Sequence, residues 1–312
     1  MQTHGLVIKN TGSWFEVRTA DGEVVPCKVK GNFRLKGIRS TSPVVVGDYV
    51  TFEKNQEGTA FISAVDDRRN CIVRKASNLS KQSHILAANI DMCLLVVTLK
   101  EPVTFPVFID RVLATAEAYS VDATIVINKV DLLDDAELEQ ARDMARLYES
   151  IGYKVCLVSV LRDEGIEPLA ELLRDKVTLL AGNSGVGKSA MLNRLVPGAN
   201  ARTSSVSEAH LSGTHTTTFS AMYDLPGGGE LIDVPGVKGF GTFNFEREEV
   251  SHYFREIFAV GRQCRFGNCI HVNEPGCAVL EAVESGEISL SRYNSYLNML
   301  DDKDEAKYRS GY

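Results

Sequence analysis

One stretch of the chain has the composition of a phosphate-binding loop. Residues 182–189 read G-x-x-x-x-G-K-S, the pattern of nucleoside triphosphatases. Glycines let backbone N–H groups wrap closely around phosphate oxygens. Lys188 would reach the β- and γ-phosphates and act in catalysis, and the Ser189 hydroxyl would ligate Mg²⁺. The predicted nucleotide-binding residues of this stretch are Gly182, Asn183, Ser184, Gly185, Val186, Gly187, Lys188, Ser189 and Ala190.

A second motif lies upstream of this loop and concerns the base. Asn128, Lys129 and Asp131 form N-K-x-D. The Asp131 carboxylate can accept from both N1–H and the 2-amino group of guanine, whereas adenine does not offer that pair and would leave a buried charge unmatched. Asn128 would hold the base and the loop, and the Lys129 stem would pack along the ring. Ser159 occupies the position of a backbone contact to the guanine oxygen. These residues predict GTP as the nucleotide.

A third group lies downstream of the phosphate loop. Asp233 and Gly236 belong to D-x-x-G. The carboxylate would hold Mg²⁺, and the Gly236 N–H would meet the γ-phosphate. A threonine before this motif would complete the metal shell. Thr216 and Thr217 are favoured over the following threonine, and Thr217 is assigned to magnesium together with Ser189 and Asp233.

Hydrolysis also needs a water molecule held in line with the γ-phosphate. The residue after D-x-x-G is Val237, which cannot orient water. His215 is therefore the predicted catalytic residue, because it stands beside the threonines that would bind Mg²⁺. The alternative is a histidine that only caps the loop. The polar residues 204–213 before it predict a mobile switch segment that a partner would order.

The order of these motifs along the chain is unusual. N-K-x-D comes first, and the phosphate loop, the threonines and D-x-x-G follow, whereas standard GTPases carry N-K-x-D last. Loops at one edge of a parallel sheet meet whatever the chain order. The sequence therefore predicts a circularly permuted GTPase.

The last segment contains a different kind of site. Cys264, Cys269, His271 and Cys277 lie within a short stretch. Three thiolates and one imidazole form a closed tetrahedral set, which is typical of a structural zinc site. The alternative is a group of reduced cysteines with a chance histidine. Such a metal would fold a segment with little core of its own, and Arg262 and Arg265 beside it are candidate phosphate contacts.

These motifs need strands and helices to position them. From residue 91 onward, apolar strands alternate with amphipathic helices, which predicts a parallel α/β sheet with helices on both faces. Strands are expected at 91–99, 122–128, 153–158, 177–181, 218–225 and 230–234. Helices are expected at 106–119, 135–152, 165–174 and 190–195, and beyond the sheet at 247–260, 277–285 and 289–300.

The N-terminal region predicts a different architecture. Residues 1 to about 68 contain about five short β-rich pieces separated by turns, which suits a small barrel of the OB type. The stretch 24–47 carries five basic residues and no acidic one. Together with Phe33 this basic run is a plausible RNA surface, although a solvated charged loop is the alternative. Residues 68–91 are expected to be a linker.

Composition narrows the class of protein. The chain has 312 residues, 44% of them hydrophobic and 24% charged, and a net charge of −7. No apolar run approaches the roughly 20 residues of a membrane span, and no signal peptide is evident, so a cytoplasmic location is expected. Seven cysteines, scattered apart from the late cluster, argue against a disulfide framework.

Taken together, the motifs resemble one bacterial family, the ribosome small subunit-dependent GTPase A. The resemblance rests on NKVDL (128–132), GNSGVGKS (182–189), HTTT (215–218), DVPGVKGFG (233–241) and CRFGNCIHVNEPGCAV (264–279). It covers essentially the whole chain. It implies an N-terminal OB-like β-barrel (1–70), a central circularly permuted P-loop GTPase domain (71–244) and a C-terminal helical zinc-binding domain (245–312).

The resemblance also implies a function. The expected activity is hydrolysis of GTP to GDP and phosphate with Mg²⁺, stimulated by the small ribosomal subunit during its late maturation, with rRNA contacts from the outer domains and a monomeric chain. It also supports the role of His215. Two residues depart from the family pattern, Thr214 at a usually basic position and Ala190 at a usual serine.

Two other functions are weighed against this one. In the first, the protein is a nucleotide-gated RNA-binding assembly factor in which hydrolysis only triggers release. In the second, it is a zinc-containing nucleotide kinase, against which N-K-x-D argues.

Overall fold

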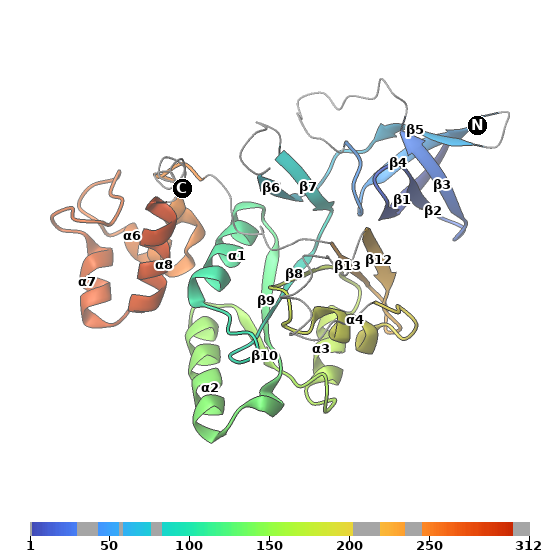
Figure 1. The fold of residues 1–312 in the computed structure, drawn as a ribbon. Coiled ribbons are helices and arrows are strands. Elements are labelled where there is room, and N and C mark those ends of the chain that lie inside the picture. Colours follow the sequence, from blue (N-terminus) through green and yellow to red (C-terminus); the bar gives the residue numbers. More distant parts are fainter. Residues whose placement is uncertain are drawn as a thin grey trace, which may run out of the picture.

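The protein consists of a barrel, a central α/β sheet and a helical C-terminal part (Figure 1). The structure is a computed structural model, and no helix of its described part is long and apolar enough to cross a membrane. The described residues are 2–29, 43–55, 59–75, 83–201, 219–234 and 245–301.

The barrel has the five strands expected from the sequence. They are β1 (Gln2–Asn10), β2 (Phe15–Thr19), β3 (Val24–Val29), β4 (Tyr49–Lys54) and β5 (Ala60–Val65). The order is β1-β2-β3-β5-β4, and β4 pairs back with β1, which closes the barrel. Alternate side chains such as Phe15 and Val17 point inward and are buried, as the two-residue period of a strand requires. The predicted small closed barrel is confirmed.

The predicted linker is wrong in one respect, because it contains a β-hairpin. Strand β6 (Cys71–Lys75) pairs antiparallel with β7 (Ser83–Ala88) as a separate two-stranded sheet. Ile85 and Ala88 pack against Val45, which lies just before barrel strand β4. The apolar residues of the hairpin fall in two short runs, 71–73 and 85–88, separated by a long polar stretch, so the sequence shows no clear hairpin pattern there.

The central sheet confirms the α/β prediction. Its strands are ordered β10-β9-β8-β11-β13-β12, and all neighbouring pairs are parallel except β12 with β13. The strands are β8 (Met92–Val97), β9 (Asp122–Ile127), β10 (Lys154–Leu157), β11 (Val177–Ala181), β12 (Ser220–Asp224) and β13 (Glu230–Asp233).

Helices cover both faces of this sheet, as expected. One apolar cluster joins a sheet face to α1 (Pro106–Ala118) and α2 (Asp135–Ser150). A second cluster joins the other face to α3 (Ile166–Leu173) and α4 (Lys188–Leu195). A short 3₁₀ turn, η1 (Val130–Leu132), follows β9.

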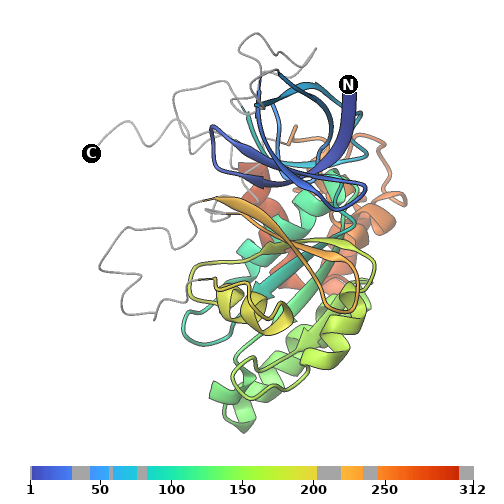
Figure 2. The same cartoon turned by 90° about the vertical axis from the view of Figure 1, so that its right-hand side faces the viewer.

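The barrel and the central sheet form one continuous structure. Strand β1 pairs antiparallel with β12 through Lys9 and Ala221 and through Asn10 and Ser220, which gives an eleven-stranded sheet. Figure 2 shows the barrel above the sheet, with β12 and β13 beneath it.

The C-terminal part is helical, with one correction. The predicted helix 247–260 is two elements, a 3₁₀ helix η3 (Val250–Tyr253) and α6 (Arg255–Gly261). They are separated at Phe254, whose backbone is extended and whose ring is fully buried against Tyr296. Helices α7 (Ala278–Ser285) and α8 (Leu290–Asp301) follow as expected.

Candidate nucleotide and metal sites

The predicted nucleotide residues gather at one edge of the central sheet. Asn128 and Gly182 directly follow β9 and β11, Ser159 lies two residues after β10, and Asp233 ends β13. Because these four strands are parallel, their carboxyl ends lie together. This edge is where ligands bind in open α/β sheets, so the permuted chain order brings together the same set of loops.

The phosphate loop is shaped by close backbone contacts. Gly182 has φ +137°, and a Cβ there would lie 2.3 Å from the Val96 carbonyl oxygen. The loop ends at Gly187, where α4 begins with Lys188. The Lys188 ammonium donates to the carbonyl oxygens of Gly182 (2.8 Å) and Asn183 (2.6 Å). The lysine that is predicted to bind phosphate thus lies along the loop itself.

Asn128 joins the N-K-x-D motif to the phosphate loop. Its side chain is 3% exposed. The amide nitrogen donates to the Val186 carbonyl (2.9 Å), and the amide oxygen accepts from the Val160 N–H (3.3 Å). Gly187 packs against it so closely that a Cβ there would be 2.3 Å from the Asn128 amide nitrogen. One side chain therefore connects three of the predicted site loops.

Ser159 has a contact that the sequence did not reveal. Its hydroxyl donates to the Asp131 carboxylate (2.5 Å) and accepts from the Arg162 N–H (3.1 Å). The sequence predicts only a backbone contact to guanine at this position, and no sequence signal points to the hydroxyl. The hydrogen bond fixes the carboxylate that is predicted to face the base.

Lys129, in the same N-K-x-D motif, is held in an uncommon backbone conformation. Its φ is +62°, in the left-handed region. The ammonium donates to the carbonyl oxygen of Glu101 in the loop after β8. Burial lowers the pKa of this lysine, because desolvation disfavours the charged form. The stem is thereby anchored at both ends, as packing along a ring would require.

The predicted γ-phosphate side is described only in part. Asp233 is 6% exposed and pairs in register with Leu180 of β11 and Ala221 of β12. Other predicted residues lie outside the described ranges: His215, Thr216, Thr217 and Gly236, the adjoining Val237, the segment 204–213, and the basic residues from Lys30 to Arg39 together with Phe33.

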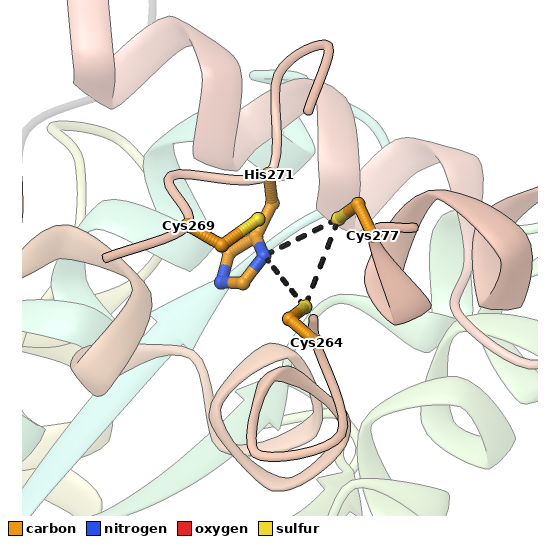
Figure 3. A group of neighbouring side chains, drawn as sticks. All are labelled: Cys264, Cys269, His271 and Cys277. Atoms are coloured by element: carbon orange, nitrogen blue, oxygen red, sulfur yellow. Dashed lines mark hydrogen bonds between the residues drawn. The ribbon is translucent and has the colours of Figure 1, made fainter. Parts of the chain in front are cut away.

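The cysteine and histidine cluster is assembled in space (Figure 3). The ligand atoms of Cys264, Cys269, His271 and Cys277 all lie within 4.8 Å of one another. The His271 Nδ1 atom is 3.5 Å from the Cys264 sulfur and 3.4 Å from the Cys277 sulfur, and these two sulfurs are 3.9 Å apart. Ligands bound tetrahedrally at about 2.0–2.3 Å from Zn²⁺ would be separated by about 3.3–3.8 Å. The cluster can hold a metal ion, and its dimensions suit zinc.

Groups around the cluster hold its loop in shape. Glu274 accepts from the N–H groups of Ile270 and Val272, both at 2.8 Å. Burial alone would raise the pKa of Glu274, but these backbone bonds lower it to about 2. From α8, Tyr293 donates to the His271 carbonyl (2.7 Å) and Tyr296 to the Ile270 carbonyl (2.6 Å). The ligand loop thus depends on α8.

The same helix α8 also contacts the central domain. Arg292, 1% exposed, donates to Asp110 of α1 (2.7 Å) and, through two nitrogens, to Glu256 of α6 (2.6 and 3.1 Å). Tyr148 of α2 donates to the same Asp110 oxygen (2.8 Å). Buried charges of this kind are tolerated only when paired and hydrogen-bonded.

Comparison with known proteins agrees with this architecture. The RsgA N-terminal domain family matches residues 4–62 and the RsgA GTPase family matches residues 65–243. The small ribosomal subunit biogenesis GTPase RsgA of Bacteroides fragilis is 58% identical over 99% of both chains. RsgA 2 of Bacteroides thetaiotaomicron is 56% identical over the same shares.

Two solved structures share the fold. YjeQ from Thermotoga maritima superposes with a TM-score of 0.76 at 35% identity, covering 96% of this chain and 98% of that one. YloQ, described as a circularly permuted GTPase, gives 0.73 at 26% identity, covering 100% and 97%. The permuted order of the motifs and the fold thus agree, and this chain belongs to the RsgA family of GTPases.

Proposed function

We propose that this protein hydrolyses GTP to GDP and phosphate on the small ribosomal subunit, during late maturation of that subunit. The observation that carries the nucleotide assignment is the contact of Asn128 with the phosphate loop at Val186. It brings the N-K-x-D loop into contact with the phosphate loop although the two motifs are far apart in the chain, which supports a single nucleotide site. The names of the Bacteroides relatives support the ribosomal role.

Guanine selection follows from the residues that face the base pocket. The Ser159 hydroxyl donates to the Asp131 carboxylate and so fixes its orientation. A carboxylate accepts from two neighbouring N–H donors, so it rejects a base that lacks them by leaving a charge unpaired. Lys129 donates from its ammonium to the Glu101 carbonyl, and its stem would pack along the ring of the base. GTP and GDP are therefore the proposed ligands.

The phosphate side would carry the chemistry. In the proposed complex, Lys188 leaves the carbonyls of its own loop and binds the β- and γ-phosphates, while the loop N–H groups bind phosphate oxygens. Ser189, Thr217 and Asp233 would hold Mg²⁺, which neutralises charge on the phosphates. Thr216 and Gly236 would close over the γ-phosphate, and His215 would orient the attacking water.

The metal at the C-terminal cluster is proposed to be one structural zinc ion. All four positions of a tetrahedral shell are filled by Cys264, Cys269, His271 and Cys277, so no position remains for a substrate. Burial raises the pKa of Cys269 to about 12. A cation is therefore what would keep these thiols ionised. The ion would fix a loop that also rests on α8.

Exposed aromatic rings beside cations support RNA contacts from both outer parts. On the barrel, the Lys28 ammonium lies 4.3 Å from the ring centroid of Trp14, which is 41% exposed. On the C-terminal part, Arg262 lies over Phe258 and Arg265 over Phe266. Such pairs can stack on unpaired bases while the cation meets phosphate. We infer that these surfaces face rRNA, with the protein acting as a cytoplasmic monomer.

A hydrolysis assay tests the proposal. Turnover of GTP and of ATP is measured with and without purified small ribosomal subunits. We expect preference for GTP and strong stimulation by the subunits. Absence of stimulation would remove the ribosomal role and leave the GTPase, whereas equal use of ATP would overturn the assignment of Asp131.

The catalytic histidine has its own test. His215→Ala is expected to lower subunit-stimulated turnover by about 10²-fold or more, with little change in GDP affinity. His4→Ala provides a control and should leave turnover unchanged, because that exposed barrel histidine contacts Thr51 and Asp66 and belongs neither to the proposed nucleotide site nor to the aromatic pairs proposed to face rRNA. Unchanged turnover in the His215 variant would show that another group orients the water.

A further inference from the structure

The β12–β13 hairpin carries two like charges at its turn end. Asp224 and Glu230 are direct cross-strand partners in this hairpin. Two carboxylates directly opposite each other destabilise a strand pair. The other end of the hairpin is Asp233, the proposed Mg²⁺ ligand. The hairpin therefore needs a cation at its turn end to hold its two strands in register.

The barrel supplies that cation. Arg18 of β2 donates to the Asp224 carboxylate and, at 3.1 Å, to Glu230. Its side chain is only 23% exposed. These ion pairs raise the pKa of Arg18, against the opposite effect of its burial. One guanidinium thus bridges both carboxylates of the pair.

The barrel also contacts the other end of the same hairpin. Lys9 of β1 pairs with Ala221 of β12, and Ala221 pairs on its other side with Asp233. Strand β12 begins one residue earlier, at Ser220. Without the barrel, β12 would be paired only with β13 and would form the edge of the central sheet. The proposed magnesium ligand is therefore one strand away from the barrel.

We propose that Arg18 is a positioning residue for the nucleotide site: by bridging Asp224 and Glu230 it fixes the hairpin and so sets the position of Asp233. The barrel thereby controls how firmly the enzyme binds Mg²⁺ with its nucleotide, and a ligand that moves the barrel changes that binding. This inference rests on the proposed metal role of Asp233.

The opposite edge of the site should not depend on this contact. Asn128 and Asp131 are held by the phosphate loop and by Ser159, and β8 and β11 lie between them and the hairpin. Base selection and metal-free nucleotide binding should therefore be independent of Arg18. This difference separates a positioning role from a general loss of structure.

The test measures nucleotide release rather than turnover. Dissociation of a fluorescent GDP analogue is followed in the full-length protein over a range of Mg²⁺ concentrations and in excess chelator. For Arg18→Glu we expect the Mg²⁺ concentration that half-maximally slows release to rise by about three- to tenfold. The release rate in chelator should be unchanged.

Two further variants make the result specific. Lys54→Glu makes the same charge change on the barrel, where Lys54 pairs with Glu23 in an exposed position, and should behave as wild type. Combining Arg18→Glu with Asp224→Arg leaves one cation between two carboxylates and should restore the wild-type Mg²⁺ dependence. Arg18→Gln gives a milder form if the glutamate variant folds poorly.

The outcomes separate the inference from the assignment beneath it. Asp233→Asn should abolish most of the effect of Mg²⁺ on release, and failure of that variant would overturn the metal role of Asp233. If Asp233→Asn acts as expected but Arg18→Glu retains the wild-type Mg²⁺ dependence, the positioning role is wrong. Faster release in chelator for Arg18→Glu would also contradict it, because the phosphate loop would then be affected.

Discussion

The central domain is joined to its two neighbours in opposite ways. At the C-terminal junction, the Arg292 and Asp110 side chains are 1% and 0% exposed. At the barrel junction, Arg18 is 23% exposed and its partners Glu230 and Asp224 are 25% and 69% exposed. Both junctions use arginine and carboxylates, but only the first removes them from water.

This difference in burial predicts that the C-terminal junction is permanent and that the barrel junction is releasable. Breaking a buried ion pair leaves an unpaired charge in a medium of low dielectric, which costs about 3–5 kcal/mol. An exposed pair contributes about 0–1 kcal/mol and is screened by salt. We expect the C-terminal part to remain fixed to α1 and α2 while the barrel can shift on the hairpin.

The largest effect is expected from Arg292→Ala. It leaves Asp110 and Glu256 without their cation and should lower the free energy of unfolding by about 3–5 kcal/mol. Urea denaturation followed by circular dichroism measures it. Arg146→Ala, which removes an exposed arginine paired with Glu139 and Asp143, is the control and should cost less than about 1 kcal/mol. Equal losses of stability in the two variants would contradict the view that burial sets the strength of the C-terminal junction.

Removal of the metal should act on the same side of the molecule. Chelation, or Cys264→Ser, should loosen the loop that Tyr293 and Tyr296 hold, and should cause amide hydrogens of α6, α7 and α8 to exchange faster. The barrel strands should keep their protection. Hydrogen exchange with mass spectrometry measures both in one sample. Unchanged exchange in α8 would show that the metal does not support the junction.

Arg255→Ala tests a second, partly exposed contact between the C-terminal part and the central domain. The guanidinium donates to Glu117 (2.6 Å) and to the Gly152 carbonyl (2.8 Å) and lies 4.1 Å from the Tyr153 ring centroid. Its side chain is 34% exposed. We expect a loss of about 1–2 kcal/mol in urea denaturation. A loss as large as that of Arg292→Ala would mean that burial does not set the difference.

The smallest effect is expected from salt. Raising NaCl to about 1 M shortens the screening length to about 3 Å. Amide exchange at the β1–β12 pairing should become faster by a factor of about two to five, a few tenths to about 1 kcal/mol. Exchange in α8 should not change. Equal responses at Lys9 and at Tyr296 would contradict a releasable barrel.

Much of this architecture could be predicted because local patterns determined it. Strand β11 agrees with its prediction at both ends, since an apolar run between a lysine and a glycine loop leaves little choice. The barrel strands followed from turns at regular spacing. The hairpin β6–β7 did not, because its apolar residues find their partners far along the chain, some against Val45 and others in the core of the central sheet. The break at Phe254 likewise depends on a distant ring, Tyr296.

The candidate site also contains features that the sequence indicates and features that it does not. Motif spacing indicated Asn128, Asp131 and the phosphate loop, because the chemistry of the expected ligand sets the types and spacing of the residues that would bind it. Contacts between protein side chains left no such signal, so the bond from Ser159 to Asp131 and the Arg18 bridge appear only in three dimensions. The roles of His215 and Thr217 stay predictions, as do the domain boundaries.

Asn128 has a consequence for altering base preference. Because its amide donates to the Val186 carbonyl, a substitution that changes its predicted contact with the base would also remove a hydrogen bond from the phosphate loop. Selectivity and overall affinity would be lost together at that position. Asp131 is bonded instead to Ser159, outside the phosphate loop. We therefore expect Asp131→Asn to shift the preference of the enzyme toward xanthine nucleotides and to leave the phosphate loop intact. Asp131 is therefore the position at which the base preference of the enzyme should be changed.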